Sequence, residues 1–394
     1  MTPPARLAAA IEILDAYLAG SAAEKALTGW ARRSRFAGSK DRAAIRDIVF
    51  VCIRCRRSFA AMGGGESGRG LALGYLCDAG LDPADWFTGD GHAPGTLTAG
   101  EKAAIGDLEE MPDEVRLDVP NWLLDDLKAS LGDDFGAVMT QMRARASVFL
   151  RVNSARVSIA SVISKLEAED IAAEPHPLAK TAILVTRNAR KLRQSSVIES
   201  GLAEFQDAAS QAVCASLVVA PEARILDYCA GGGGKALALA DRPHGAVFAH
   251  DADPARMRDL PIRAARAEVE IEVLGPEAVI ANAPYDIVFC DVPCSGSGAW
   301  RRAPDGKWRL SREMLDDLLR EQSDILEGTY PMVAPDGVLA YATCSLLDVE
   351  NSKQIEAFLA RHPDWICTFS QRFTPLDGGD GFFCAHLTRK PGTL

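Results

Sequence analysis

Two short apolar runs, each followed closely by a cysteine, are the features that most constrain the fold of this chain. Residues 287–290 (Ile-Val-Phe-Cys) precede Cys294, and residues 338–341 (Val-Leu-Ala-Tyr) precede Cys344. Uninterrupted apolar runs bounded by Pro or Gly are typical of strands buried in a parallel sheet. Because the carboxyl ends of such strands form the ligand crevice, two neighbouring strands would bring both thiols into one pocket. For either cysteine alone, a packing role in the core stays open.

A glycine loop upstream has the order strand, turn and helix. Residues 225–230 (Ile-Leu-Asp-Tyr-Cys-Ala) lead into four glycines and Lys235, and an Ala/Leu helix is expected over residues 236–240. Glycines in this position let backbone N–H groups approach a ligand closely. Residues 246–250 then predict a second strand that ends at Asp251, where folds of this class hold a ribose hydroxyl. The pattern indicates a nucleoside cofactor.

The residues around the glycines narrow the choice of cofactor. A phosphate-binding Walker loop is excluded because Lys235 is followed by Ala236 rather than Ser or Thr. Asp227 lies within the first strand, just before the glycines. A carboxylate there suits S-adenosylmethionine, whose sulfonium and amine are positively charged, better than a pyrophosphate.

Several further motifs occur in a fixed order along the chain. They are Phe205-Gln206-Asp207 with Ala209-Ser210-Gln211, Pro293-Cys294-Ser295-Gly296, Arg301-Arg302, Pro304-Asp305, Lys307-Trp308, Thr343-Cys344-Ser345 with Glu350-Asn351-Ser352, and Gly379-Asp380-Gly381-Phe382-Phe383. With these motifs the chain resembles the Fmu/Sun (RsmB) family of S-adenosylmethionine-dependent RNA cytosine-carbon-5 methyltransferases. The resemblance covers roughly residues 145–390 and implies a Rossmann-like class I methyltransferase sheet.

The resemblance assigns roles to individual residues. Cys344 would attack carbon 6 of the cytosine and form a covalent Cys–cytosine intermediate, and Cys294 would assist the release of the product. Asp291 would stabilise the added state at the N3 edge, as a carboxyl whose pKa burial raises. The cofactor would lie along a set of residues supported by Asp227, namely Cys229, Ala230, Gly231, Gly232, Gly233, Gly234, Lys235, Asp251 and Asp291. The target base must be unpaired or flipped out of its stack. No metal is expected.

Two positions depart from the family pattern. The usual Ala-Pro-Gly-Gly-Lys loop is Gly231-Gly232-Gly233-Gly234-Lys235 here, which predicts a less stiff loop. The acid that usually follows the third strand has no clear counterpart, and Glu277 is the only nearby candidate. We therefore expect the free protein to bind the cofactor weakly.

Composition places the chain among ordinary globular proteins of two or three domains. It has 394 residues, 48% of them hydrophobic and 25% charged, with a net charge of −11. Without a stretch of about 18 apolar residues or a signal-peptide pattern, the protein is expected in the cytoplasm, away from membranes, and as a monomer. The ten cysteines should then be mostly reduced, and Cys52 with Cys55 is expected to pack rather than bind zinc.

The basic residues are unevenly distributed, which reconciles an acidic chain with an RNA partner. Nine basic residues lie close together, namely Arg32, Arg33, Arg35, Lys40, Arg42, Arg46, Arg54, Arg56 and Arg57. A second group comprises Arg187, Arg190, Lys191 and Arg193, with Arg143, Arg145 and Arg151 upstream. Solvated helix faces are the alternative interpretation of each group.

The pattern along the chain predicts three domains. Residues 1–116 form an all-helical unit that resembles the NusB-like RNA-binding domain of the family, with a helix over residues 43–55 capped at Ser39. Residues 117–199 form a small connecting α+β RNA-binding region, and residues 200–394 form the α/β methyltransferase domain.

The resulting hypothesis is an RNA cytosine-5 methyltransferase that acts on 16S ribosomal RNA. Two alternatives stay open, a transfer RNA cytosine-5 methyltransferase and a noncatalytic RNA-binding factor in ribosome assembly. Cys344, Cys294 and Asp291 argue against the noncatalytic factor, since loss of one of them would be expected there. A small-molecule methyltransferase would explain neither the two cysteines nor the basic helical unit.

Overall fold

The computed structural model describes residues 1–242 and 245–392, and it divides the chain into two compact units. The first unit joins Met1–Arg145 with the segment Trp300–Arg309, and the second unit holds the remaining residues. The segment Trp300–Arg309 is therefore separated in sequence from the rest of its unit by more than half of the second unit. The domain boundaries expected at residues 116 and 199 stay predictions.

The first unit is helical. Its helices are α1 (Pro3–Leu18), α2 (Ala23–Arg33), α3 (Ser39–Arg54), α4 (Arg56–Met62), α5 (Gly68–Asp78), α6 (Ala99–Ala103), α7 (Asp113–Arg116), α8 (Leu124–Leu131), α9 (Phe135–Met142) and α16 (Pro304–Arg309). Leu7, Ile13, Ile53 and Phe59 are among the buried residues of its core. The helical N-terminal region is confirmed, but the expected cap is wrong because Gly38 is the N-cap of α3 and Ser39 is its first residue.

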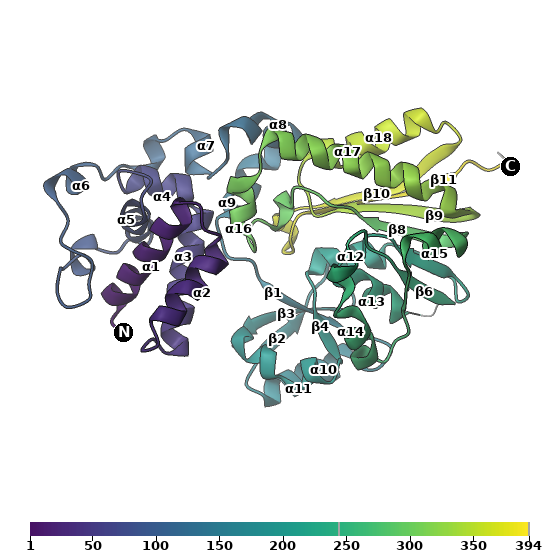
Figure 1. Cartoon of the computed structure of the whole chain (residues 1–394), viewed down its shortest axis with the longest axis horizontal. Coiled ribbons are helices and arrows are strands. Elements are labelled where there is room, and N and C mark those ends of the chain that lie inside the picture. The colour runs from purple at the N-terminus through teal and green to yellow at the C-terminus, as the bar shows by residue number, and fades with distance from the viewer. Residues whose placement is uncertain (243–244, 393–394) are drawn as a thin grey trace. The chain divides into compact units, whose positions relative to one another are not determined.

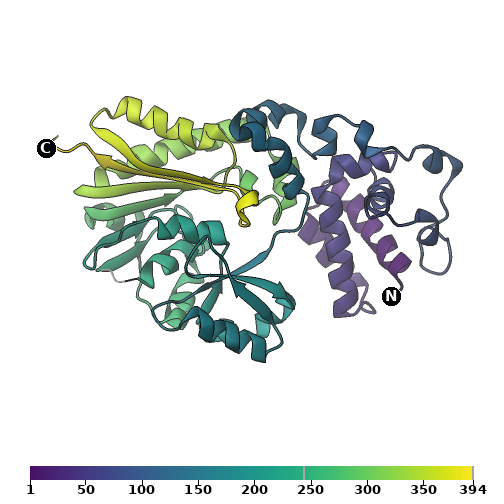
Figure 2. The same cartoon turned by 180° about the vertical axis from the view of Figure 1, so that it is seen from behind.

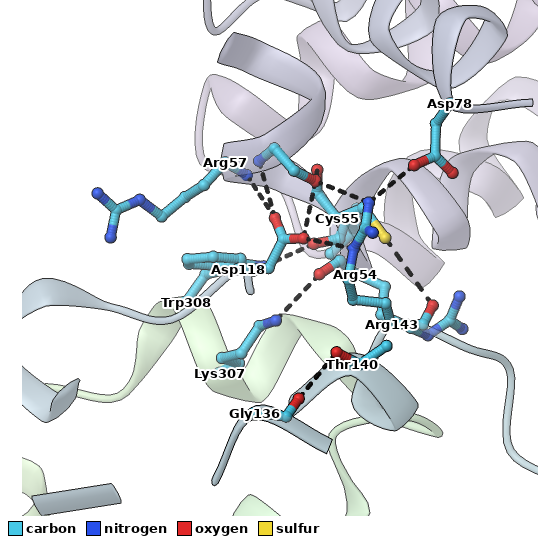
Figure 3. A network of polar contacts seen from close by, with 12 residues as sticks. Arg54, Cys55, Arg57, Asp78, Asp118, Gly136, Thr140, Arg143, Lys307 and Trp308 are labelled. Atoms are coloured by element: carbon cyan, nitrogen blue, oxygen red, sulfur yellow. Dashed lines mark hydrogen bonds and ion pairs between the residues drawn. The ribbon is translucent and has the colours of Figure 1, made fainter. Parts of the chain in front are cut away.

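Helix α16 is anchored in this unit by buried polar contacts (Figure 3). Lys307 Nζ donates to the carbonyl oxygen of Arg54 at 3.0 Å, and Trp308 Nε1 donates to the carbonyl oxygen of Ile53 at 2.6 Å. In return, Arg54 donates from Nε and Nη2 to the carbonyl oxygen of Arg301. The predicted RNA contact Arg54 is thus buried in the fold, because its guanidinium holds this segment.

Asp118 lies at the centre of the same network and is completely buried (Figure 3). One carboxylate oxygen accepts from the amides of Arg57 and Ser58 in the first turn of α4, and the other accepts from Ser58 Oγ and Arg143 Nε. Burial lowers the pKa of Lys307 to about 8, although the charge of Asp118 opposes this shift. Asp118 is thus both the cap of α4 and the counter-charge of the buried cations.

The second unit contains a small antiparallel sheet in the order β2-β3-β1-β4. Its strands are β1 (Val148–Val152), β2 (Ala172–Pro175), β3 (Ala182–Arg187) and β4 (Ala203–Phe205). Helices α10 (Ile159–Ala168) and α11 (Ser196–Glu199) cover one face, as seen from behind in Figure 2. The other face contacts α12 (Ala208–Ala215) of the large sheet.

The large sheet has seven strands in the order β10-β11-β9-β8-β5-β6-β7 (Figure 1). They are β5 (Arg224–Asp227), β6 (Ala246–Ala249), β7 (Glu272–Val273), β8 (Tyr285–Asp291), β9 (Val333–Thr343), β10 (Trp365–Phe373) and β11 (Phe382–Arg389). Strands β5 to β9 pair in parallel, and β11 is antiparallel to both its neighbours. The predicted Rossmann-like sheet is confirmed.

Helices cover both faces of this sheet (Figure 1). One core contains α12 together with α13 (Gly234–Ala240) and α14 (Leu260–Ala267). The opposite core contains α15 (Pro276–Ala281), α17 (Arg312–Thr329) and α18 (Ser352–Arg361). With both faces covered, the carboxyl edge of the parallel strands is left for ligands. None of the described helices is long and apolar enough to cross a membrane.

We expect Asp118→Ala to destabilise the helical unit by about 3–5 kcal/mol, because it leaves buried cations and two helix amides without their acceptor. Urea unfolding monitored by hydrogen–deuterium exchange in α3 and α4 measures the loss. The matched control is Asp113→Ala, which breaks an ion pair with Arg116 in which both side chains are over 40% exposed. Its effect should stay below about 1 kcal/mol. Equal effects of the two substitutions would contradict the central role of Asp118.

Candidate active site

The two cysteines singled out in the sequence lie together at the carboxyl ends of β8 and β9. These strands are parallel neighbours in which Asp291 pairs with Ala342, so both strands end at the same edge of the sheet. Cys294 and Cys344 follow within three residues, and their Sγ atoms are 3.4 Å apart. Both are free thiols that are partly exposed. The pairing of the strands therefore presents two thiols to one ligand.

The environment of Cys294 favours its neutral form. Its hydrogen bond with Cys344, and then burial, raise the pKa of the Cys294 thiol well above its usual value. The charges of Cys344 and Glu350 act in the same direction. Cys294 is thus a thiol at neutral pH, which a second group must assist if it is to lose its proton.

Asp291 at the end of β8 is held by Lys235 from the start of α13. Lys235 Nζ lies 2.5 Å from Asp291 Oδ2 and 5.2 Å from the centre of the Phe382 ring. Burial opposes the lysine charge, but Asp291 outweighs it, and the pKa of Lys235 is raised. Asp291 itself is 28% exposed. The ion pair therefore links the glycine loop to the end of β8 beside the cysteines.

Asp227 is fully buried at the carboxyl end of β5. Burial, followed by the negative charge of Asp291, raises the pKa of Asp227 to about 7. Lys235 lowers it, but not enough to offset those two effects. This carboxyl is therefore poised to ionise near neutral pH, and a bound cation would favour its charged form.

The glycine loop is tied on both sides by charged residues. Gly231 N donates to Asp251 Oδ2 at 2.8 Å, and Arg263 Nη1 donates to the carbonyl oxygen of Gly232. Arg256, which is 56% exposed, pairs with Asp251 at 3.2 Å. The loop is thus held at two points, which offsets part of the flexibility that its glycines predict.

Two of the four glycines are required by the backbone. Gly231 has a φ of +51° and Gly233 a φ of +81°, a region that other residues rarely adopt. A Cβ on Gly233 would lie 2.2 Å from Leu260 Cδ1. The alanine usual in the family at position 231 would therefore be strained in this conformation.

Ala230 and Cys229 are further residues that the sequence predicts to line the cofactor. Ala230 is buried, and its amide donates to the carbonyl oxygen of His250 at 2.8 Å. Burial raises the pKa of the Cys229 thiol strongly. Glu277, the only candidate for the missing third-strand acid, is exposed at the start of α15. Among residues 1–242 and 245–392, no group of three or more His, Cys, Asp or Glu side chains could hold a metal.

The sequence pattern does not single out Glu350 as a site residue, although the motif that contains it is part of the resemblance. It is completely buried, and its carboxylate accepts hydrogen bonds from Ser295 and Ser345, the residues directly after the two cysteines. Gln322 on α17 also donates to it, at 3.1 Å. Only the assembled fold shows this convergence, because the partners come from three separate stretches of the chain.

The structure divides the predicted basic cluster of the helical unit into two sets. Six of its nine members are held by contacts within the unit, namely Arg33, Arg42, Arg46, Arg54, Arg56 and Arg57. Arg32, Arg35 and Lys40 are exposed and form no ion pair with a described residue. In the second cluster, Arg151 is buried against Asp241, whereas Arg193 is exposed.

We expect Asp227→Asn to stabilise the protein at alkaline pH. The folded pKa of about 7 lies above the usual 3.8, so stability is lost as pH rises from about 4 to 7, where only the unfolded chain ionises. Above pH 7 the substitution should add stability, by at most about 4 kcal/mol, and the gain should vanish near pH 4. Melting temperatures between pH 4 and 9 measure this.

The control for this series is Asp336→Asn, which changes an exposed carboxylate on β9. It should shift stability by less than about 0.5 kcal/mol at every pH. A folded Asp227→Asn protein with no gain at pH 8 would contradict the destabilising burial of this charge.

Comparisons with known proteins identify two matching families of sequence. Residues 214–388 match the family described as 16S rRNA methyltransferase RsmB/F, and residues 119–190 match the ferredoxin-like domain of RsmF/B-like methyltransferases. The ribosomal RNA small subunit methyltransferases B of Yersinia pseudotuberculosis (serotype O:1b) and Yersinia pestis are 32% identical over 286 residues. The alignment covers 69% of this chain and 66% of each relative, just under two thirds of its length.

Solved structures show the same fold. The crystal structure of PH0851 is 22% identical, has a TM-score of 0.76 and covers 99% of both chains. A methyltransferase homologue from Pyrococcus horikoshii has a TM-score of 0.62 at 22% identity, over 71% of this chain and 98% of that one. NSun6 from the same organism, determined with SFG, has a TM-score of 0.60 at 16% identity, over 69% of this chain and 98% of that one.

Proposed function

Because this chain belongs to the RsmB/F family of methyltransferases, we propose that it methylates carbon 5 of cytosine in small-subunit ribosomal RNA. The observation that carries the proposal is the pair of free thiols, 3.4 Å apart, at the carboxyl edge of a Rossmann-like sheet. A small-molecule methyltransferase has no need of two such thiols. Carbon 5 of cytosine is a poor nucleophile, and a thiol that adds to carbon 6 makes it enamine-like.

In this proposal the two cysteines act in succession. Cys344 bonds to carbon 6 of an unstacked cytosine, and its sulfur leaves again once carbon 5 has lost its proton. Cys294 is within hydrogen-bonding distance of Cys344 and assists that release. Asp291 stabilises the added state by hydrogen bonding at the N3 edge of the ring, and Lys235 orients Asp291 through the ion pair at Oδ2.

The chain's acids fit S-adenosylmethionine as the methyl donor. Asp227 and Asp251 are buried carboxyls on either side of the glycine loop, and a cationic ligand would favour the ionised form of Asp227. Asp251 would hold the ribose hydroxyls in place of Arg256, whose exposed side chain can leave without burying a charge. Bound there, the cofactor supplies an electrophilic methyl group. A relative in the fold comparison, NSun6, was determined with SFG, an analogue of this cofactor.

We expect the two cysteine substitutions to have opposite effects on the covalent complex. Cys344→Ala should abolish methylation, to below about one per cent of wild type, and prevent any adduct because it removes the attacking sulfur. Cys294→Ala should accumulate a protein–RNA adduct that survives a denaturing gel when S-adenosylmethionine is present. The measurement uses labelled cofactor with bulk RNA, followed by gel analysis.

The double mutant is the control and should form no adduct. An adduct in Cys344→Ala but not in Cys294→Ala would reverse the two roles. If Cys344→Ala loses RNA methylation but still binds RNA as wild type does, the protein is an enzyme and not a noncatalytic assembly factor. Mapping 5-methylcytosine in cells with and without the gene distinguishes ribosomal from transfer RNA.

The helical unit offers a face suited to single-stranded RNA. Phe36, in the loop between α2 and α3, is 76% exposed and rests edge-on against the buried Trp30, with ring centroids 6.5 Å apart. Arg32, Arg35 and Lys40 are close to it in sequence, are exposed, and form no ion pair within residues 1–242 and 245–392. An exposed aromatic ring among cations provides stacking for a base and charge for its phosphates. The cytoplasmic location and monomeric state expected from the sequence are part of the same proposal.

We expect Phe36→Ala to weaken binding of single-stranded RNA about tenfold, which corresponds to about 1.4 kcal/mol of lost stacking. Arg35→Glu should weaken binding and reduce its salt dependence. Fluorescence anisotropy with a labelled oligonucleotide at several salt concentrations measures both. Lys102→Glu, on α6 of the same unit, makes the same charge change at another exposed position. If it weakens binding as much as Arg35→Glu does, overall charge rather than this face accounts for the affinity.

A further inference from the structure

Glu350 connects the two loops that carry the cysteines. It ends the short helix η9 (Asp348–Glu350), and none of its surface is exposed. Oε1 accepts from Ser295 N at 2.8 Å, and Oε2 accepts from Ser295 Oγ at 2.5 Å and from Ser345 Oγ. Ser295 follows Cys294 and Ser345 follows Cys344, so a single carboxylate sets the position of both thiols.

Two amide side chains, of Gln322 and Asn351, also bond to these loops; together with Glu350 they are called the clamp below. Gln322 Nε2 donates to Glu350 Oε1 at 3.1 Å and to the carbonyl oxygen of Pro293 at 2.9 Å. Asn351 donates to the carbonyl oxygen of Ser345 at 3.0 Å and accepts from Thr343 Oγ1 at 2.5 Å. Both loops are therefore held on each side of their cysteine.

The carboxylate forms no ion pair with any residue in the described ranges 1–242 and 245–392. A buried charge held only by hydrogen bonds is an expensive way to join two loops, since a neutral amide of the same size could bond to them as well. Hydrogen bonding alone therefore does not explain why this residue is negatively charged. The two neighbouring cysteine thiols, whose ionisation a nearby charge affects, offer an explanation.

We propose that Glu350 is a positioning residue that holds the two cysteines together and places its buried negative charge beside Cys294, so that Cys344 is the nucleophile. The role of Cys344 in this statement rests on the proposed function. The difference in reactivity between the two thiols does not rest on the proposed function, since it is a property of the protein without RNA or cofactor.

The groups that face Cys294 are consistent with this inference. They are Cys344 after β9, Glu350 in η9 and Tyr341 within β9, while the cation Lys235 interacts with Cys344. None of the three that interact with Cys294 is a cation. The charge of Glu350 raises the pKa of Cys294, in addition to the larger effects of the Cys344 hydrogen bond and burial.

The substitution that tests the charge is Glu350→Gln. Its amide oxygen can replace Oε1 and accept from Ser295 N and Gln322. Its NH₂ group can donate to Ser295 Oγ and Ser345 Oγ, and the displaced proton of Ser345 can turn to Ser297 Oγ at 3.0 Å. The geometry of the clamp is thus retained while the charge is lost.

The measurement is alkylation of RNA-free protein by iodoacetamide between pH 6 and 10, with Cys294 and Cys344 quantified separately by peptide mass spectrometry. In wild type, Cys344 should react faster than Cys294. In Glu350→Gln, the ratio of the alkylation rate of Cys344 to that of Cys294 should fall about tenfold at pH 8. This is equivalent to a shift of about one pH unit in the titration of Cys294. An unchanged preference in folded Glu350→Gln would overturn the proposal.

Two control variants separate charge from geometry. Glu356→Gln makes the same change at an exposed position on α18 and should leave the preference unchanged. Ser295→Ala removes the hydroxyl that bonds to Glu350 Oε2 and to Ser297 but keeps the charge, so the preference for Cys344 should stay within about twofold of wild type. An effect of Ser295→Ala as large as that of Glu350→Gln would show that geometry alone is responsible.

The wild-type profile keeps the inference falsifiable if Glu350→Gln does not fold. A Cys294 that reacts faster than Cys344 in the intact protein would overturn the inference by itself. The alkylation readout needs neither RNA nor cofactor. Its failure can therefore be told apart from a failure of the proposed methyltransferase activity.

Discussion

The parallel pairing of β8 with β9 is the constraint on which the candidate active site depends. Hydrogen bonding between the two strands fixes Asp291 opposite Ala342, and each strand is followed by a short loop that carries one cysteine. A one-residue shift of this register would turn every side chain of one strand to the other face and separate the thiols. Residues 287–290 of β8 and 339–343 of β9 are buried without interruption, so both faces of the paired segments are covered, which leaves little freedom for such a shift.

Around this fixed pair the protein buries an unusual number of charges for one small region. Asp227, Asp251 and Glu350 are each at most 3% exposed, and Lys235, whose side chain is 12% exposed, pairs with Asp291. Buried charges seldom stabilise a fold beyond what apolar residues would achieve, so their presence here is better explained by chemistry. The acids near the glycine loop suit a cationic cofactor, and Glu350 adjusts the thiols.

The helical unit depends on a segment from elsewhere in the sequence. Six residues after Cys294 the chain enters Trp300–Arg309, whose Lys307 and Trp308 bond to the end of α3 and whose Trp308 packs against the helical core. An N-terminal fragment that lacked this segment would leave Asp118 without the Lys307 charge. The unit is therefore completed by the same stretch of chain that follows the first cysteine motif.

The sequence by itself determined the type of fold and the identity of the two thiols. Apolar runs, glycine turns and cysteines are local patterns, and strand order then brings Cys294 and Cys344 together without further information. The sequence could not show that Gly38 rather than Ser39 caps α3, because either residue suits a cap and packing decides between them. Nor could it show that six of nine clustered basic residues are held within the helical unit, since a charge pattern does not show which carboxylates and carbonyl oxygens lie against them in the fold.

Only the tertiary structure decided the contacts between residues distant in sequence. Glu350 meets Ser295 across 55 positions and Gln322 across 28, and Arg54 meets Arg301 across 247. Such contacts follow from how whole elements pack, which no local pattern encodes. Burial likewise belongs to the assembled fold, and it is burial that raises the pKa of Asp227 and gives the uncompensated charge of Glu350 its effect on a neighbouring thiol.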